Sequence, residues 1–225
     1  MADHEYEQPR SNGLAIAALI CGIIGILIFP VGIVGLVLGI VALTQGQNKG
    51  MAVTGIVLGG LALLVVPIAI IAAIAIPNLL ESRVTANEAS AAATLKSAIF
   101  PAEIQFQSGA YADADGDAIG EYGSLRALNG DGRTLIAGPL AHGDVAHGYR
   151  FAIFVPDETD LAERHFVAYA WPVSPDMGRR VFALTSAGNV HSVAATDLKG
   201  QPPSWDTALG GGTWGDPVTW PVHTR

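Results

Sequence analysis

The most concentrated chemistry in the sequence is a run of alternate carboxylates. Asp113, Asp115 and Asp117 alternate with small residues, and Glu121 follows four positions later. Alternate carboxylates in a tight turn can direct several oxygens to one centre, as the hard cation Ca²⁺ requires. The run is not an EF-hand, because Ala118 stands where the loop glycine belongs. The sequence supports two hypotheses, a Ca²⁺ site made by these four acids or an acidic turn in solvent.

No catalytic motif accompanies this run. The sequence contains no Gly-x-Ser-x-Gly, no His-Glu-x-x-His and no phosphate-binding glycine loop. We therefore expect that the protein is not an enzyme. A recognition face made of tryptophans is an alternative, although burial in a small core is the simpler explanation for such side chains. The four tryptophans are Trp171, Trp205, Trp214 and Trp220.

Charge and cysteine content exclude some classes of partner. The formal net charge is −8, and residues 77–225 hold 10 Lys and Arg against 17 Asp and Glu, a net of −7. Nucleic acids are bound through a basic surface, so we expect no nucleic-acid partner. A disulfide framework is ruled out because Cys21 is the single cysteine.

The N-terminal third has the composition of a membrane domain. Between Arg10 and Glu81 the only charged residue is Lys49, and a soluble surface cannot be built from so few charges. We divide this part into a polar tail at 1–13 and a membrane domain at 14–76. Residues 51–76 would form a helix of about 39 Å, enough to cross a hydrocarbon core of about 30 Å. Residues 14–43 form either one tilted span, which we prefer, or two short helices that turn back near Pro30.

The membrane domain contains an internal repeat. Residues 35–43 read GLVLGIVAL and residues 55–63 read GIVLGGLAL, identical at six of nine positions. Each copy holds two glycines one helical turn apart, the spacing at which helices approach closely in lipid. These helix-packing residues are Gly35, Gly39, Gly55 and Gly59. They would serve either self-association or packing of the two helices within one chain, which we favour because the repeat supplies both halves.

The region from residue 77 to residue 225 has the pattern of an α+β domain. Leu80, Val84, Ala91, Leu95 and Ile99 recur at helical spacing, and Pro101 is expected to kink or end that helix. Strands are predicted at 149–155, 166–173, 181–185 and 190–193. The tail from Gly200 is expected to be loop. We therefore predict N-terminal transmembrane helices, the last continuing into an amphipathic helix that packs on a small antiparallel sheet.

Two stretches resemble known families. Residues 12–17 and 50–59 resemble an uncharacterised bacterial two-helix membrane domain over about 12–66, which implies membrane residence. Residues 72–82, AAIAIPNLLES, resemble the end of the hydrophobic half-helix of type IV pilins and type II secretion pseudopilins, with a similar downstream order over about 56–225.

The second resemblance implies a pilin-like fold in the bacterial cytoplasmic (inner) membrane with an extracytoplasmic C-terminal domain. It implies a structural or assembly role through contacts with other membrane, pilus or secretion proteins, besides contact with membrane lipid. The alternative is a membrane-tethered extracytoplasmic binding or sensor module that uses the acidic run for Ca²⁺ or a tryptophan face for a ligand. In this orientation the loop with Lys49 is cytoplasmic, and a single first crossing would place the N-terminus outside.

One departure from the pilin pattern affects processing. Counted back from Pro77, a pilin leader would be cut after Gly55, where Ile56 replaces the family's phenylalanine and Gly60 its glutamate. The glutamate neutralises a neighbouring amine in the filament, because a buried charge needs a partner. We therefore expect residues 1–76 to stay attached to the mature protein.

Overall fold

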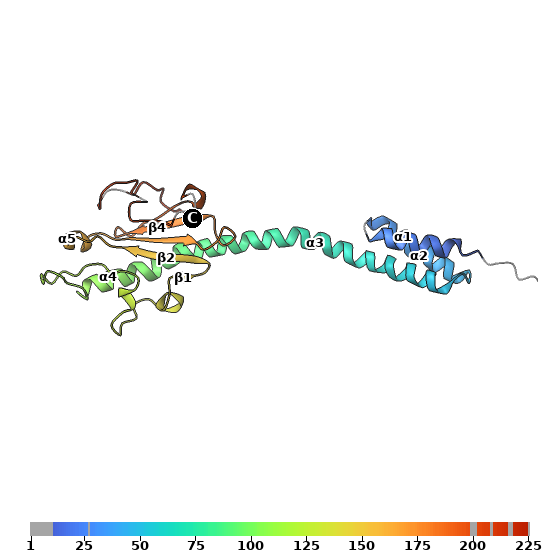
Figure 1. The fold of residues 1–225 in the computed structure, drawn as a ribbon, viewed down its shortest axis with the longest axis horizontal. Coiled ribbons are helices and arrows are strands. Elements are labelled where there is room, and N and C mark those ends of the chain that lie inside the picture. The colour runs from blue at the N-terminus through green and yellow to red at the C-terminus, as the bar shows by residue number, and fades with distance from the viewer. Residues whose placement is uncertain (1–10, 27, 199–201, 208, 216–217, 225) are drawn as a thin grey trace, which may run out of the picture. The chain divides into compact units, whose positions relative to one another are not determined.

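The computed structural model of the chain describes residues 11–26, 28–198, 202–207, 209–215 and 218–224. Most of the predicted polar tail lies outside the described residues. The chain divides into two compact units, residues 1–78 and residues 79–225. Figure 1 colours the described residues of the first unit from blue to cyan-green and those of the second from green to red.

The first unit contains a helical hairpin where a single span was expected. Helices α1 (Gly13–Gly25) and α2 (Phe29–Thr44) are separate elements. They pack so closely that a Cβ added to Gly25 would lie 2.3 Å from the Cα of Gly32. Pro30 stands in the first turn of α2, where its missing N–H costs nothing and its fixed φ starts a new helix. Residues 14–43 therefore form two helices packed on each other, where the preferred interpretation expected one tilted helix.

The four predicted packing glycines lie against other helices of the same chain. Gly35 meets α1, where its Cβ would lie 2.7 Å from the Gly22 nitrogen. The first turns of α3 (Lys49–Thr94) pack against both α1 and α2. A Cβ on Gly39 would lie 2.7 Å from Ile56 Cγ1, and one on Gly59 would lie 2.6 Å from a carbonyl oxygen of α2. A Cβ on Gly55 would lie 2.8 Å from the carbonyl carbon of Ala18 in α1. Only glycine permits these approaches, because any Cβ would overlap an atom of the neighbouring helix.

Two hydrogen bonds close the polar end of this unit. The backbone N–H of Asn48 donates to Asn12 Oδ1 at 3.1 Å, and the backbone N–H of Ala15 donates to Gln47 Oε1 at 3.0 Å. The start of α1 and the loop between α2 and α3 therefore lie at the same end of the hairpin.

Helix α3 is the first part of a helical run that continues to Ser108. A π-turn (Leu95–Ile99) and α4 (Phe100–Ser108) follow it directly. Pro101 was expected to kink or end the helix, but the run passes through it. The π-turn accommodates the proline, because Pro101 cannot donate the hydrogen bond that the preceding turn would need. Among the described helices, this run is the one long and apolar enough to cross a membrane by length and composition, and 11% of its most apolar 18 residues are buried.

The second unit contains a five-stranded antiparallel sheet in the order β1-β2-β3-β4-β5. Its strands are β1 (Val145–Ala146), β2 (Tyr149–Phe154), β3 (Val167–Pro172), β4 (Arg180–Thr185) and β5 (Val190–Ala194). The four predicted strands are confirmed to within one residue at each end. Strand β1 was not predicted, because two residues are too few to show alternation. Short helices η2 (Ala127–Asn129), η3 (Gly138–Ala141), α5 (Thr159–Ala162) and η4 (Ala195–Leu198) connect these elements.

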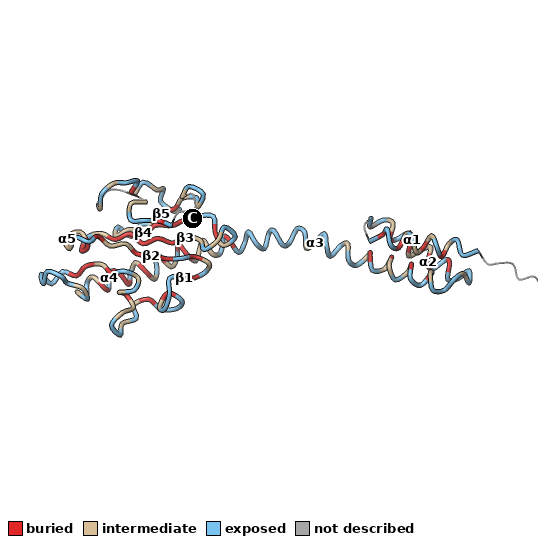
Figure 2. Tube along the Cα trace, in the orientation of Figure 1, coloured by how far each residue is buried: buried red, intermediate tan, exposed pale blue. Residues whose placement is uncertain are grey.

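The helical run packs on one face of this sheet and forms the core. Leu95, Ile99 and Phe106 are buried against Phe151 and Phe182, as the red stretches of Figure 2 show for these elements. Each such side chain contributes about 1.5–3 kcal/mol through removal of apolar surface from water. The α+β prediction is confirmed.

The predicted apolar face of the helix is only partly right. Four of its five residues, Val84, Ala91, Leu95 and Ile99, are buried, whereas Leu80 is 55% exposed. Leu80 belongs to the second unit by sequence, but it precedes the stretch of α3 on which the sheet packs.

The other face of the sheet is covered by the C-terminal tail. Buried Tyr169 contacts a cluster that includes Trp171, Trp214 and Trp220. Trp205 stacks on Trp214 with ring centroids 5.3 Å apart and stays 38% exposed. Most of the tryptophans therefore pack on the sheet, and one retains a large exposed fraction.

Candidate metal centre

The acidic run forms a loop that is held against the end of α4. The chain turns back after Ser108, and a Cβ on Gly120 would lie 2.3 Å from the Gln107 carbonyl oxygen. The Glu121 amide donates to the Ala112 carbonyl at 3.1 Å and closes the neck of the loop. The close approach at Gly120 and this hydrogen bond therefore hold together the two ends of the loop that carries the carboxylates of residues 113–121.

Inside the loop, aspartates accept hydrogen bonds from backbone amides. Asp113 accepts from Gly116 at 2.7 Å and from Ala118 at 3.1 Å, and Asp117 accepts from the amide two residues later. Gly116 and Ala118 both have positive φ, 79° and 72°, a conformation that is strained for alanine. The loop is thus a folded turn with its amides already satisfied by its own carboxylates.

This turn brings three of the four predicted ligands together. Asp113, Asp115 and Asp117 each present an oxygen, and these oxygens lie within 4.8 Å of one another. Ca²⁺ binds oxygens at 2.3–2.6 Å, so ligands on opposite sides of one ion are about 4.6–5.2 Å apart. The spacing fits a single Ca²⁺ ion.

A second group of ligands comes from α5, far away in the sequence. Asp160 and Glu163 place carboxylate oxygens within 4.8 Å of each other and of Asp115. Two hydrogen bonds hold α5 beside the loop: Tyr122 N–H donates to the Ala162 carbonyl at 2.9 Å, and Gln107 Nε2 donates to the Glu163 carbonyl at 3.2 Å. Asp115 belongs to both groups and joins them.

Sequence reasoning missed Asp160 and Glu163. The available signal was a second acidic run, Asp157-Glu158-Thr159-Asp160. Nothing local to that run indicates that it folds beside residues 113–121, because the contact depends on where the loop after α4 meets the connection between β2 and β3.

The two groups and Glu121 together are called the acidic cluster. Two glutamates of this cluster are buried and have an oxygen without a hydrogen-bond partner. Glu121 is 7% exposed and Glu163 is 8% exposed. Glu121 Oε1 accepts from the Ala114 amide at 2.8 Å, but Glu121 Oε2 and Glu163 Oε1 are buried without a hydrogen-bond partner among the described residues. Glu121, the fourth predicted ligand, therefore lies at the neck of the loop and outside both groups of converging oxygens.

An unpartnered buried carboxylate oxygen is costly, since it has lost its water and gained nothing. Burial raises the pKa of Glu163, and the neighbouring charges of Asp117, Asp115, Asp160 and Glu121 raise it further. Among the described residues, the ion pairs use other acids, Asp131, Asp144 and Glu81. The cluster therefore concentrates negative charge that no side chain of the described chain compensates.

No family model, no curated protein and no solved structure matches the chain.

The donor set selects the kind of metal. Carboxylate oxygens are hard ligands and suit Ca²⁺ or Mg²⁺, whereas Zn²⁺ prefers nitrogen and sulfur. Mg²⁺ demands near-ideal octahedral geometry at 2.0–2.1 Å. A group of oxygens spread over 4.8 Å on two segments matches the longer, more flexible coordination of Ca²⁺ better.

Proposed function

We propose that this protein is a membrane-anchored, Ca²⁺-binding module whose second unit lies outside the cytoplasm and acts through contacts with other molecules rather than through catalysis. The observation that carries the proposal is Glu163, a buried carboxylate with an unpartnered oxygen that belongs to one of two groups of converging acids. Glu121, also buried with an unpartnered oxygen, lies at the neck of the same loop. Bound Ca²⁺ would join the loop after α4 to α5 and order both.

The anchor in this proposal is the apolar part of α3 together with the α1–α2 hairpin. Because the hydrogen bonds of Asn12 and Asn48 place the start of α1 and the α2–α3 loop at one end, the hairpin returns to its own side of the bilayer. A single crossing by α3 then separates both from the C-terminal domain. With Lys49 on the cytoplasmic side, as positive residues prefer, the start of α1 is also cytoplasmic. This topology replaces the external N-terminus that a single first crossing implied.

A second candidate is a pilin-like subunit of a pilus or secretion assembly. It is supported by a long helix whose apolar first half leads into a second half packed on an antiparallel sheet. Filament assembly would require the apolar half of α3 to contact neighbouring subunits. In this chain its first turns already contact α1 and α2 through Gly55 and Gly59, which favours a permanent anchor.

Calcium titration of the full-length protein in detergent micelles tests the metal site. Unfolding should shift to higher temperature in Ca²⁺, because a ligand of the folded state stabilises by RT ln(1 + [L]/Kd), about 2.7 kcal/mol at a hundredfold excess over Kd. Mg²⁺ should do less. Asp115→Asn should abolish the shift, since Asp115 belongs to both groups of ligands.

Asp157→Asn is the matched control, because Asp157 is an exposed acid of the second acidic run that belongs to neither group of ligands. It should keep the calcium response. Equal melting temperatures of the wild type in calcium and in chelator would remove the site and leave the acidic run as a solvated turn.

A further inference from the structure

The edge of the sheet beyond β1 carries backbone groups that the sheet does not use. Strand β2 pairs with β3 over six residues, but β1 covers only Tyr149 and Arg150. Two hydrogen bonds fix which groups point outward: Val173 N–H donates to the Gly148 carbonyl at 3.0 Å, and Phe151 N–H donates to the Asp144 carbonyl at 2.7 Å. Even-numbered residues of β2 therefore bond β3, and odd-numbered residues face the outer edge.

This alternation leaves the backbone N–H and C=O of Ile153 without a strand partner on the outer edge, although the residue as a whole is only 8% exposed. On the N-terminal side of Asp144 the chain belongs to η3 and no longer runs beside β2. The next pair of the ladder would be His142 with Ile153, and no backbone hydrogen bond joins these two described residues. The Ile153 N–H and C=O thus face the side where a neighbouring strand would lie. The Val155 N–H, one residue beyond the end of β2, forms no backbone hydrogen bond among the described residues. Backbone groups of this kind are a template for another chain.

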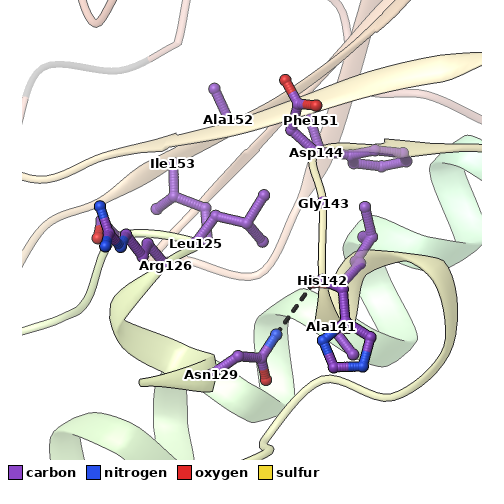
Figure 3. Close-up of a pocket in the computed structure, with 12 residues that line it drawn as sticks. Leu125, Arg126, Asn129, Ala141, His142, Gly143, Asp144, Phe151, Ala152 and Ile153 are labelled. Atoms are coloured by element: carbon purple, nitrogen blue, oxygen red, sulfur yellow. Dashed lines mark hydrogen bonds between the residues drawn. The ribbon is translucent and has the colours of Figure 1, made fainter. Parts of the chain in front are cut away.

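A cavity occupies that space. It has a volume of about 500 Å³ and is lined by Phe151–Ile153, by Ser124–Arg126 and by Ala141–Asp144, with Asn129 and Leu140. In Figure 3 the side chains of Leu125 and Ile153 point toward each other across it, and Asn129 closes one side through its hydrogen bond to the Leu140 carbonyl at 3.0 Å. The floor is apolar, and one wall is the free edge of β2.

The rim carries a positive charge. Asp144 is paired with Arg150, with Nε and Oδ2 3.6 Å apart. Arg126 is exposed and has no ion pair among the described residues, so it is the lining charge left for a ligand.

We propose that this cleft binds an extended peptide segment of a partner protein by β-strand addition, antiparallel to β2 and in line with β1. The main chain of the peptide would bond Ile153 and Val155, alternate apolar side chains would enter the cleft over Leu125, and a carboxylate of the peptide would meet Arg126. Backbone bonds supply affinity in this mode, and pockets for alternate side chains supply specificity. The proposal does not depend on the metal site.

The probes are fluorescein-labelled, N-acetylated nonapeptides of alternating valine and threonine, one carrying two aspartates and one carrying two lysines. Each is titrated by fluorescence anisotropy against the full-length protein in phosphatidylcholine nanodiscs. The acidic peptide should bind at least fivefold more tightly than the basic peptide. Arg126→Glu should reverse that order, whereas Arg83→Glu, a change of the same kind at an exposed arginine of α3, should preserve it.

Backbone methylation separates strand addition from simple apolar contact. In an added strand, alternate amides of the peptide point toward β2 and the others point to solvent. N-methylation of one alternate set should abolish binding, and methylation of the other set should leave it within twofold. Equal effects of the two methylated sets would overturn the proposal.

Hydrogen exchange measured by mass spectrometry locates the contact. In the free protein the Ile153 amide should exchange faster than those of Ala152 and Phe154, and the acidic peptide should slow exchange at Ile153 and Val155. Slow exchange at Ile153 before any peptide is added would refute the open edge. Failure of both peptides to bind, or protection confined to another region, would refute the proposed partner.

Discussion

Glu103 of α4 accepts a hydrogen bond from the Gly123 amide, with Oε2 and the nitrogen 2.9 Å apart. Glu103 is fully buried, and its second oxygen has no hydrogen-bond partner among the described residues. The bond fastens the segment after the acidic loop to the helix that packs on the sheet. It thereby holds the neck of the candidate metal centre at the cost of a carboxyl group in the core.

Burial raises the pKa of Glu103 from 4.5 to about 8, and the hydrogen bond from Gly123 only partly opposes this. The folded state therefore holds a proton that the unfolded chain releases above pH 4.5. The proton on Glu103 therefore stabilises the folded state relative to the unfolded chain. This stabilisation is complete below pH 4.5 and is lost as the pH rises to about 8. The shift corresponds to roughly 3–5 kcal/mol between the two limits.

Glu103→Gln should remove this dependence, because the amide keeps an acceptor for Gly123 and has no charge to bury. The variant should unfold at a higher temperature than the wild type at pH 9 and lose that advantage at pH 5. Unfolding of the full-length protein, followed by tryptophan fluorescence across that range, measures the difference. Glu158→Gln, at an exposed position, should track the wild type. A constant offset between Glu103→Gln and wild type at every pH would contradict the assignment.

The sheet and its helix were predictable because their signals are local. Val181–Thr185 and Val190–Val193 alternate and flank a turn, and Leu95 and Ile99 recur at helical spacing. The hairpin of α1 and α2 was not predictable from the sequence. Both of its halves are apolar on every side, and a break at Pro30 is equally compatible with a kink or with a turn. Its outcome is decided by glycines that meet across the hairpin.

The candidate metal centre was half predictable for a related reason. The Asp113 run displays its chemistry in consecutive residues, whereas Glu163 joins it only through the tertiary contact between α5 and the loop. Glu103 gave no signal, because a glutamate inside an amphipathic helix ordinarily faces solvent. Long-range packing, rather than sequence pattern, decides which carboxylates are buried.

Gly25→Val should disrupt the first unit, because a Cβ at this position would lie 2.3 Å from the Cα of Gly32, a backbone atom that cannot move aside. The two helices would have to separate, with a loss of at least the 1–3 kcal/mol that overpacking typically costs. Gly60→Ala is the control, since its Cβ would meet only a leucine methyl at 3.8 Å. Thermal unfolding of the full-length protein in micelles should show a lower midpoint for Gly25→Val alone. Equal midpoints for both variants would contradict the close packing of α1 on α2.

Residues 1–76 should remain attached in the protein isolated from its native cells. A pilin-type cut would fall after Gly55, but this bond lies within α3, and a Cβ at Gly55 would lie 2.8 Å from the backbone of Ala18. A protease must first unwind this turn and detach it from α1, which the glycine contacts oppose. Peptide mapping of the isolated protein by mass spectrometry should therefore find an uncut peptide that joins Gly55 to Ile56. The variant Ile56→Phe with Gly60→Glu restores the two residues that pilins carry, and it should also stay intact if packing protects the bond. Cleavage of that variant alone would assign protection to the missing residues, and a wild-type chain that begins at Ile56 would show that the hairpin is a removable leader.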